Sequence, residues 1–391
     1  MEKRFGVVSA DGHCRLPHLP FDLWTNRLPR RLLDDAPRVV KDTDGARRWV
    51  VEGHPWSGVG WAGVGRGAVN CYTRAGLAEE AEPGIFRAAS TKYRCEDMDR
   101  DGVDAELVNG PYEQLHQIKN PELRAACVRA VNDWARELYK ESGGRFILLL
   151  PLPCMTPDEA VAELLRVAEF GLPTGVIFDW VGAPEPVLHQ VWEPVWAAAA
   201  ETGMPVNLHA NPSGGTRQIG VGVTSAAPCN QALMRVVNFP MGMMAELMSA
   251  VVFSGICDRH PGIRFVLEEA GVGWVPFMFW RFDREYHFGG PETRVFKPDV
   301  ALAAAPSELV QKHLFFTFEV EEEGGFRRVS EVGIENFLWA SDFPGLDSPW
   351  PHSKAEGHAP VEAALGKEML NQLVFENAVR LYNIPIDSNG A

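Results

Sequence analysis

The feature that most constrains the fold is a regular alternation of short apolar runs with amphipathic stretches, which continues along almost the whole chain. Short apolar runs are typical of buried strands, and amphipathic stretches between them are typical of the helices that connect parallel strands. The pattern therefore predicts repeated βα units. The predicted strands are residues 5–10, 105–109, 146–152, 175–180, 205–209, 263–268, 314–320 and 337–341.

Three of the stretches between these runs have clear helix signals. Residues 121–142, 157–170 and 186–202 have proline or acidic residues near their starts and are soon followed by glycine. Proline suits the first turn of a helix, and glycine suits the position after its last turn. Eight strands joined by such helices predict the α/β class, as a single (β/α)8 TIM barrel formed by residues 1–391.

Residues from about 14 to 90 do not follow the βα rhythm. They are rich in proline, glycine, tryptophan and arginine and follow the first predicted strand. Segments inserted after a strand of such a barrel lie at its carboxyl-terminal mouth, where substrates bind. We therefore expect an insertion after the first strand that forms a lid or wall at the barrel mouth.

Composition narrows the classes of function. Hydrophobic residues make up 46% of the chain and charged residues 23%, which is typical of a globular protein, and the formal net charge of −15 disfavours nucleic acid as a partner. No signal-peptide pattern and no apolar stretch of membrane-spanning length is present, so we expect a cytoplasmic protein without a membrane partner. The seven cysteines form no CxxC pair, which favours reduced thiols.

Polar residues follow four of the predicted strands, at the end of the barrel where catalytic groups gather. Asp11 and His13 follow the first strand, His209 ends the fifth, Glu269 follows the sixth and Asp342 follows the eighth. Side chains alternate along an extended segment, so the D-x-H spacing places the first two on one face. All five residues are of types that bind metal ions, and together they predict a metal site.

Two glutamates follow the sixth strand, and alternation sends only one of them towards the barrel axis. The Ala-Gly turn after Glu269 favours that residue over Glu268 as the inward one, and we predict it as a ligand and catalytic residue. Asp342 can bind the metal or accept a proton from a metal-bound water, which makes it the natural general base.

The segments SADGH, EDMDRDGVDAELV, PVNLHAN, LEEAGVGWVPFMFWRFDREY, FLWASDFP and ENAVRLYNI occur in this order along the chain. Together they resemble the amidohydrolase-related family, which includes aminocarboxymuconate-semialdehyde and resorcylate decarboxylases. The resemblance implies a (β/α)8 barrel with one divalent metal ion. It also implies that the ligands of that ion are Asp11, His13, His209 and Asp342.

The chain departs from the family pattern at two positions. Many relatives have a histidine on the sixth strand that helps in catalysis, and the matching position here is Glu269. Relatives often have a histidine three residues after the eighth-strand aspartate, where this chain has Gly345. The metal ligands remain in place, but these changes affect the residues available for proton transfer and substrate contact.

These residues support one main reading of function and two alternatives. The main reading is a metal-dependent hydrolase or decarboxylase that acts on a carboxylated small organic molecule, with one ion of zinc, manganese or iron. The first alternative starts from the oxygen-rich ligand set, which resembles carboxylate-bridged metal pairs. It is a monooxygenase with two iron ions that hydroxylates a bulky apolar substrate. The second alternative is a non-catalytic metal-binding scaffold.

A two-ion site needs a further carboxylate, for which the candidates are Glu319, Glu322 and Glu96. The expected partner is a small-molecule substrate. The apolar segment 274–280 and the methionine-rich stretch 230–257 exceed what the outer ring of a barrel needs to bury, so we also expect a homodimer.

Overall fold

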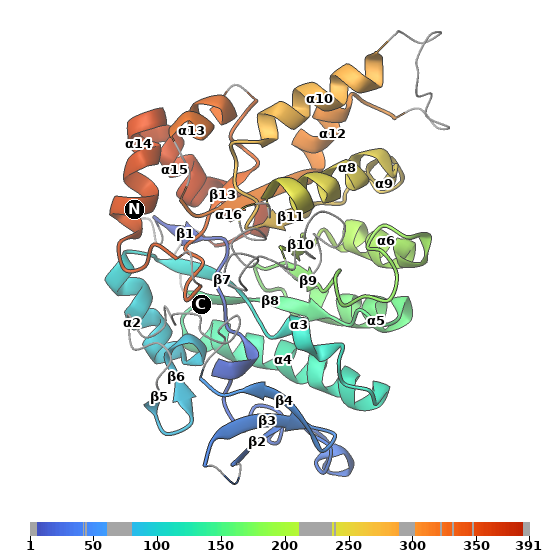
Figure 1. Ribbon diagram of the computed structural model, residues 1–391, viewed down its shortest axis with the longest axis vertical. Helices are drawn as coiled ribbons and strands as arrows, with labels where there is room; N and C mark the ends of the chain where they lie inside the picture. Colours follow the sequence, from blue (N-terminus) through green and yellow to red (C-terminus); the bar gives the residue numbers. More distant parts are fainter. Residues whose placement is uncertain are drawn as a thin grey trace, which may run out of the picture.

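Eight parallel strands form one sheet that closes on itself. The computed structural model describes residues 6–41, 43, 45–60, 80–210, 237, 240–288, 302–320, 323–330, 332–345 and 348–385. The strands follow one another in chain order around the sheet, and helices cover its outer face (Figure 1). The strands are β1 (Val8–Ser9), β7 (Ala105–Asn109), β8 (Phe146–Leu152), β9 (Val176–Phe178), β10 (Val206–His209), β11 (Phe265–Glu268), β12 (Leu314–Phe318) and β13 (Phe337–Trp339).

The barrel closes where the last strand meets the first. The Ala10 amide donates to the Trp339 carbonyl at 3.0 Å, and a parallel bridge joins Gly12 to Phe343 just beyond the strands. The predicted (β/α)8 barrel is thus confirmed, and each predicted strand contains one strand of the sheet. The first and last strands are shorter than predicted, because their ends turn into the loops that carry polar side chains.

Two of the three predicted helices begin at the residue that the sequence signals indicate. At α4 (Pro121–Glu141), the Asn120 side chain accepts hydrogen bonds from the amides of Glu122 and Leu123, and Pro121 occupies the first turn. The helix buries one stripe of apolar side chains against β8, whose seven residues are all buried. Each large apolar side chain buried there stabilises the fold by roughly 1.5–3 kcal/mol.

The predicted helix 186–202 is the one that differs most, since α6 begins only at Glu193 after a short 3-10 turn. Pro194 lies in its first turn, where the missing N–H is not needed. The α-helices are α2 (Thr91–Asp101), α3 (Tyr112–Leu115), α4 (Pro121–Glu141), α5 (Pro157–Ala168), α6 (Glu193–Thr202), α8 (Ala245–Phe253), α9 (Ile256–Arg259), α10 (Val275–His287), α12 (Pro306–His313), α13 (Glu323–Ser330), α14 (Ala359–Leu365), α15 (Lys367–Asn371) and α16 (Asn377–Tyr382).

Between β1 and α2 the chain forms antiparallel structure outside the barrel rhythm. A three-stranded sheet contains β2 (Arg38–Lys41), β3 (Arg47–Val51) and β4 (His54–Gly58), and a hairpin contains β5 (Glu80–Glu82) and β6 (Ile85–Phe86). The three-stranded sheet lies beside α4 (Figure 1). Residues 61–79 lie outside the described part of this segment, and its role as a lid stays a prediction.

Two tryptophans fix this segment to the barrel. The rings of Trp24 and Trp49 are fully buried, with centroids 5.3 Å apart, and the Trp24 Nε1 atom donates to the Cys127 carbonyl of α4.

In the described ranges, no helix combines the length and apolar character that crossing a lipid bilayer requires. Phe277 and Trp280 on α10 are 43% and 56% exposed. The homodimer stays a prediction.

Candidate metal centre

Loops at the carboxyl-terminal ends of four strands bring the five predicted ligands together. Asp11 and His13 lie just after β1, His209 is the last residue of β10, Glu269 follows β11, and Asp342 follows β13. In the register of the sheet, His209 pairs with Glu268, the residue before Glu269. His209 and Glu269 therefore lie at nearly the same level along the barrel.

The ligand atoms converge on one point. The His13 Nε2 atom lies 2.7 Å from Asp342 Oδ1 and 3.5 Å from Glu269 Oε1. The His209 Nε2 atom lies 3.2 Å from the same Glu269 oxygen, and each imidazole is 3.9 Å from one oxygen of Asp11. The two rings stand edge to face, with centroids 4.9 Å apart. All five predicted ligands therefore face a common centre.

Two of these residues have backbone conformations that are rare outside glycine. Glu269 has a φ of 54° and Asp342 a φ of 48°, both in the left-handed region. Such strain is stored at functional sites, and here it turns each chain segment sharply as it leaves its strand. The turn at Glu269 also explains why strict alternation fails at this point.

Glu268 differs from the prediction that alternation would send it away from the barrel axis. It is fully buried, and its Oε2 atom accepts a hydrogen bond of 3.0 Å from Asn109 Nδ2. The same amide group donates to Asp11 Oδ1 at 2.9 Å. Because the left-handed turn follows directly after Glu268, both Glu268 and Glu269 face the interior.

Two supporting residues escaped the sequence prediction, namely Asn109 and Thr317. The Thr317 hydroxyl accepts from the Glu269 amide at 2.8 Å and lies 3.4 Å from Asp11 Oδ2, to which it donates. Asn109 could have been found, since it is a polar residue that ends a predicted strand. The His209 Nδ1 atom bonds the Ala210 carbonyl, which leaves Nε2 as the atom with the free lone pair.

A buried ion pair ties together the loops after β1 and β13, which carry His13 and Asp342. The Arg94 side chain is fully buried and donates to Glu106 Oε2 at 2.8 Å, to the His13 carbonyl at 2.7 Å and to the Phe343 carbonyl at 3.0 Å. Burial raises the pKa of Glu106, although Arg94 acts in the opposite direction. Arg94 thus fixes the backbone beside two predicted ligands, His13 and Asp342.

Gly12, the middle residue of the D-G-H triplet, has no room for a side chain. A Cβ atom there would lie 2.8 Å from Arg94 Nη2 and would overlap the Glu106 carboxylate. We expect Gly12→Ala to lower the free energy of unfolding by about 1–3 kcal/mol, because the buried pair must move. Chemical denaturation measures this loss. Gly242→Ala is the control, since nothing lies within 4 Å of its added Cβ, and equal losses in both variants would contradict the prediction.

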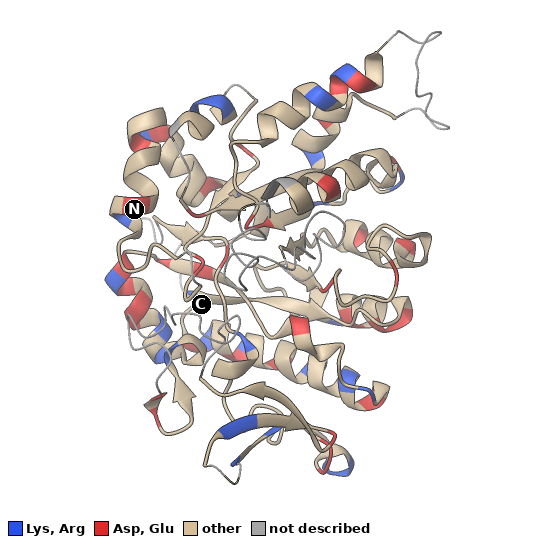
Figure 2. Cartoon of the chain, viewed as in Figure 1, with Lys and Arg blue, Asp and Glu red and all other residues tan. Residues whose placement is uncertain are grey.

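The centre is strongly acidic. Figure 2 shows acidic residues inside the barrel, while lysine and arginine colour mainly the outer helices and β3. Burial and the neighbouring Glu268 carboxylate raise the pKa of Asp11 well above its usual value, and burial raises the pKa of Glu268 to about 7. Burial also acts to raise the pKa of Glu269, but the imidazoles of His209 and His13 outweigh it and hold that pKa well below its usual value.

A cation fits this set of residues. Two overlapping groups, Asp11 with His13 and His209, and His13 with Glu269 and Asp342, each have ligand atoms within 4.8 Å of one another. The Nε2 atoms of both histidines and Asp342 Oδ1 are buried. None of these atoms makes a hydrogen bond of suitable geometry among the described residues, although His13 Nε2 and Asp342 Oδ1 lie only 2.7 Å apart. Each buried polar atom without a hydrogen bond lowers the folding stability by roughly 1–3 kcal/mol. Buried carboxylates normally pair with a cation or bind a metal. Glu269, whose side chain is 24% exposed, lies on the open side of the centre.

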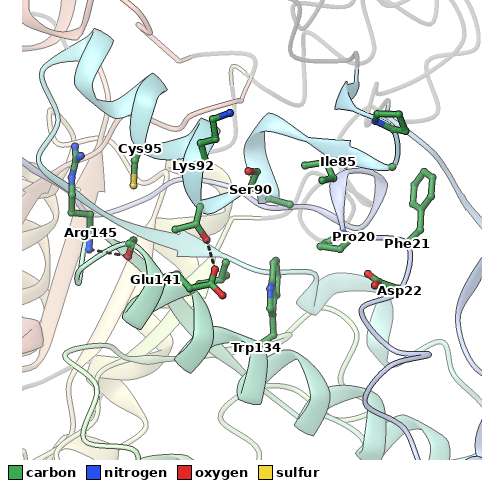
Figure 3. Close-up of a pocket in the computed structure, with 16 residues that line it drawn as sticks. Pro20, Phe21, Asp22, Ile85, Ser90, Lys92, Cys95, Trp134, Glu141 and Arg145 are labelled. Carbon is green, nitrogen blue, oxygen red and sulfur yellow. Dashed lines mark hydrogen bonds between the residues drawn. The ribbon is translucent and has the colours of Figure 1, made fainter.

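The structure describes two of the three candidate additional ligands, Glu96 and Glu319. The side chain of Glu96 is 50% exposed on α2 and pairs with Arg87. Neither Glu96 nor Glu319 joins a metal-type cluster in the part of the chain that the structure describes, and Glu322 lies outside that part. A cavity of about 920 Å³ between the β5–β6 hairpin, α2 and α4 contains none of the five predicted ligands (Figure 3).

Comparison with known proteins finds a similar sequence and similar folds. The chain is similar to gamma-resorcylate decarboxylase of Rhodococcus jostii (strain RHA1), with 25% identity over 264 residues, which cover 63% of this chain and 75% of that protein. Its fold is similar to that of 5-carboxyvanillate decarboxylase from Sphingomonas paucimobilis (TM-score 0.64, 19% identity, 97% of this chain and 100% of that one).

A second similar fold is that of a dihydroxybenzoic acid decarboxylase from Polaromonas sp. JS666, whose crystal structure holds manganese and the inhibitor 2-nitroresorcinol (TM-score 0.59, 14% identity, 97% of each chain). Residues 49–384 match the sequence model of the Amidohydrolase family. That match covers most of the barrel, and it agrees with the resemblance seen in the sequence motifs. The chain belongs to the amidohydrolase family.

Proposed function

We propose that the protein is a metal-dependent decarboxylase of a carboxylated aromatic compound. The observation that carries this proposal is the convergence of the five predicted ligands, with both Nε2 atoms unpartnered, in a barrel of the amidohydrolase family. The similar proteins named above are decarboxylases of aromatic acids, and one of them holds manganese. Manganese is therefore the first ion to test.

Asp11, His13, His209, Glu269 and Asp342 would hold one divalent cation. Bound there, such an ion would supply positive charge that helps to bind the substrate carboxylate. His209 would offer its Nε2 atom to the ion, because its Nδ1 atom is engaged by the Ala210 carbonyl. Asn109 and Thr317 hold the Asp11 carboxylate in place through their side-chain hydrogen bonds.

The chain's own residues then handle one proton. The bond between the ring carbon and the carboxylate carbon breaks, carbon dioxide leaves, and a new C–H bond forms with a proton from Asp342. Solvent then supplies a new proton to the Asp342 carboxylate. Asp342 suits this role because its Oδ1 atom lies 2.7 Å from His13 Nε2 at the centre, while its backbone amide is fixed by the Asp11 carbonyl. Glu269, at the position of the family histidine, offers a second carboxylate within 4.8 Å of that of Asp342.

The alternative with two iron ions receives no support from the similar proteins named above. Glu268 does add an inward carboxylate, but Asn109 engages one of its oxygens. We therefore keep a single ion and non-redox chemistry as the proposal.

The experiment is to incubate manganese-loaded protein with dihydroxybenzoates and 5-carboxyvanillate, and to measure the release of carbon dioxide and of the matching phenol. We expect release with at least one of these acids, its loss after chelation, and its return when manganese is added back. No release from any of them, by protein that holds its ion, would count against the proposal.

A further inference from the structure

Three other side chains with metal-binding chemistry meet at the same end of the barrel. Cys154 lies just after β8, Asp179 directly follows β9, and His116 is the residue after α3, which follows β7. The candidate metal centre takes its predicted ligands from the loops after β1, β10, β11 and β13. The second cluster therefore uses three consecutive loops that the first leaves without a ligand.

The contacts within this cluster are close. One ligand atom from each of His116, Cys154 and Asp179 lies within 4.8 Å of the other two. The His116 Nδ1 atom is 2.7 Å from Asp179 Oδ2, and the other oxygen of Asp179 accepts from the Gly182 amide at 2.8 Å. Cys154 and Asp179 are 4% and 3% exposed, whereas the His116 side chain is 27% exposed. Cys154 and Asp179 are thus buried, and His116 is the member of the cluster that solvent reaches.

The loop after β9 is shaped around this cluster. A Cβ atom at Gly182 would overlap both the Asp179 carboxylate and the His116 ring. The backbone can approach the two side chains this closely only because the residue is glycine. The Gly182 backbone therefore lies directly against the side chains of His116 and Asp179.

We propose that His116, Cys154 and Asp179 form a second cation site, which takes a softer divalent ion of the zinc type. Thiolate and imidazole together favour such ions over the hard ions that prefer oxygen. Zn–S bonds of about 2.3 Å and Zn–N bonds of about 2.0–2.1 Å place neighbouring ligand atoms about 3.3–3.6 Å apart, which small side-chain rotations reach here. The Cys154 thiol proton passes to solvent on binding, and neutral His116 supplies a lone pair.

Such a site would act on the candidate metal centre through α3. His116 follows the last residue of that helix, and Tyr112 begins it. The Tyr112 ring is buried and lies 6.3 Å, between centroids, from the ring of His209. An ion bound to His116 therefore fixes the short helix that places Tyr112 beside the candidate metal centre.

Cobalt(II) is the probe that separates the two sites. Bound to a thiolate it gives a charge-transfer absorption in the near ultraviolet, and the five predicted ligands of the candidate metal centre include no sulfur. We expect metal-free full-length protein to develop this band and to saturate it at one equivalent of thiolate-bound cobalt. The band should persist in Asp11→Ala, which disrupts the other centre.

Cys154→Ser is the decisive variant, because it keeps the size of the side chain and removes the thiolate. We expect it to lose the band, and Asp179→Asn to weaken cobalt binding at this site. The matched control is Cys257→Ala, which removes another buried free cysteine, in α9, and should keep the band. The proposal is overturned if the parent protein shows no band, if Cys154→Ser keeps it, or if Cys257→Ala loses it as well. Circular dichroism verifies that each variant is folded.

Discussion

Asp342→Asn is expected to lower kcat for decarboxylation by roughly 10²–10⁴-fold, the range for removing a group that transfers the proton. Asparagine has nearly the same shape, but its amide cannot carry the proton between solvent and the ring carbon. It also tolerates the left-handed backbone at this position, where φ is 48°, so the fold should survive. Steady-state release of carbon dioxide measures the effect.

The metal content of Asp342→Asn must be measured beside its activity. Retained metal with a large fall in kcat supports proton transfer by Asp342, whereas loss of the ion makes the residue chiefly a ligand. Asp99→Asn is the control, because the Asp99 side chain is 67% exposed and pairs only with Arg145 among the contacts described. Unchanged kcat in a metal-loaded Asp342→Asn protein would contradict the assignment.

Arg94→Met is expected to cost about 3–5 kcal/mol of folding stability, because it leaves a charged partner buried and unpaired. Arg94 is fully buried, and its loss removes hydrogen bonds to the Glu106 carboxylate and to the carbonyls of His13 and Phe343. Chemical denaturation measures the free energy of unfolding. Metal affinity should fall too, since these two loops carry His13 and Asp342.

The double variant Arg94→Met with Glu106→Gln tests the cause of that loss. If the unpaired buried charge dominates, the double variant should be more stable than Arg94→Met alone. Arg31→Met is the control for an exposed ion pair, because Arg31 and Glu122 are 66% and 56% exposed. It should cost at most about 1 kcal/mol. A similar small cost for Arg94→Met would show that the buried pair does not hold the loops.

The barrel and its ligand-bearing loops were predictable, because both depend on local patterns. Strands 105–109 and 146–152 were predicted to the residue, since apolar runs between strong turn and helix signals leave little choice. The rule that selects polar residues at strand ends also predicted Asp11, His209 and Asp342 at the centre. Applied to every strand, the same rule selects Asn109 and Asp179, which the structure places in the two clusters.

The remaining features of the site depend on the three-dimensional fold, which no local sequence pattern contains. The inward position of Glu268 results from the left-handed turn at Glu269, which the preference of glutamate for ordinary backbone conformations argues against. Arg94 donates hydrogen bonds to residues as far as 249 positions away in the sequence. The sequence alone also cannot separate a ligand from a surface charge at Glu96, because acidic residues on a helix are equally able to form exposed ion pairs, and this one lies 3.4 Å from Arg87.

The most direct test of the central claim is an anomalous difference map from crystals grown with manganese, with data collected at the manganese absorption edge. We predict one strong peak enclosed by Asp11, His13, His209, Glu269 and Asp342, within bonding distance of both Nε2 atoms. Absence of a peak at this position, in crystals that contain manganese, would contradict the account. Two peaks there would contradict the single-ion centre and favour a dinuclear one.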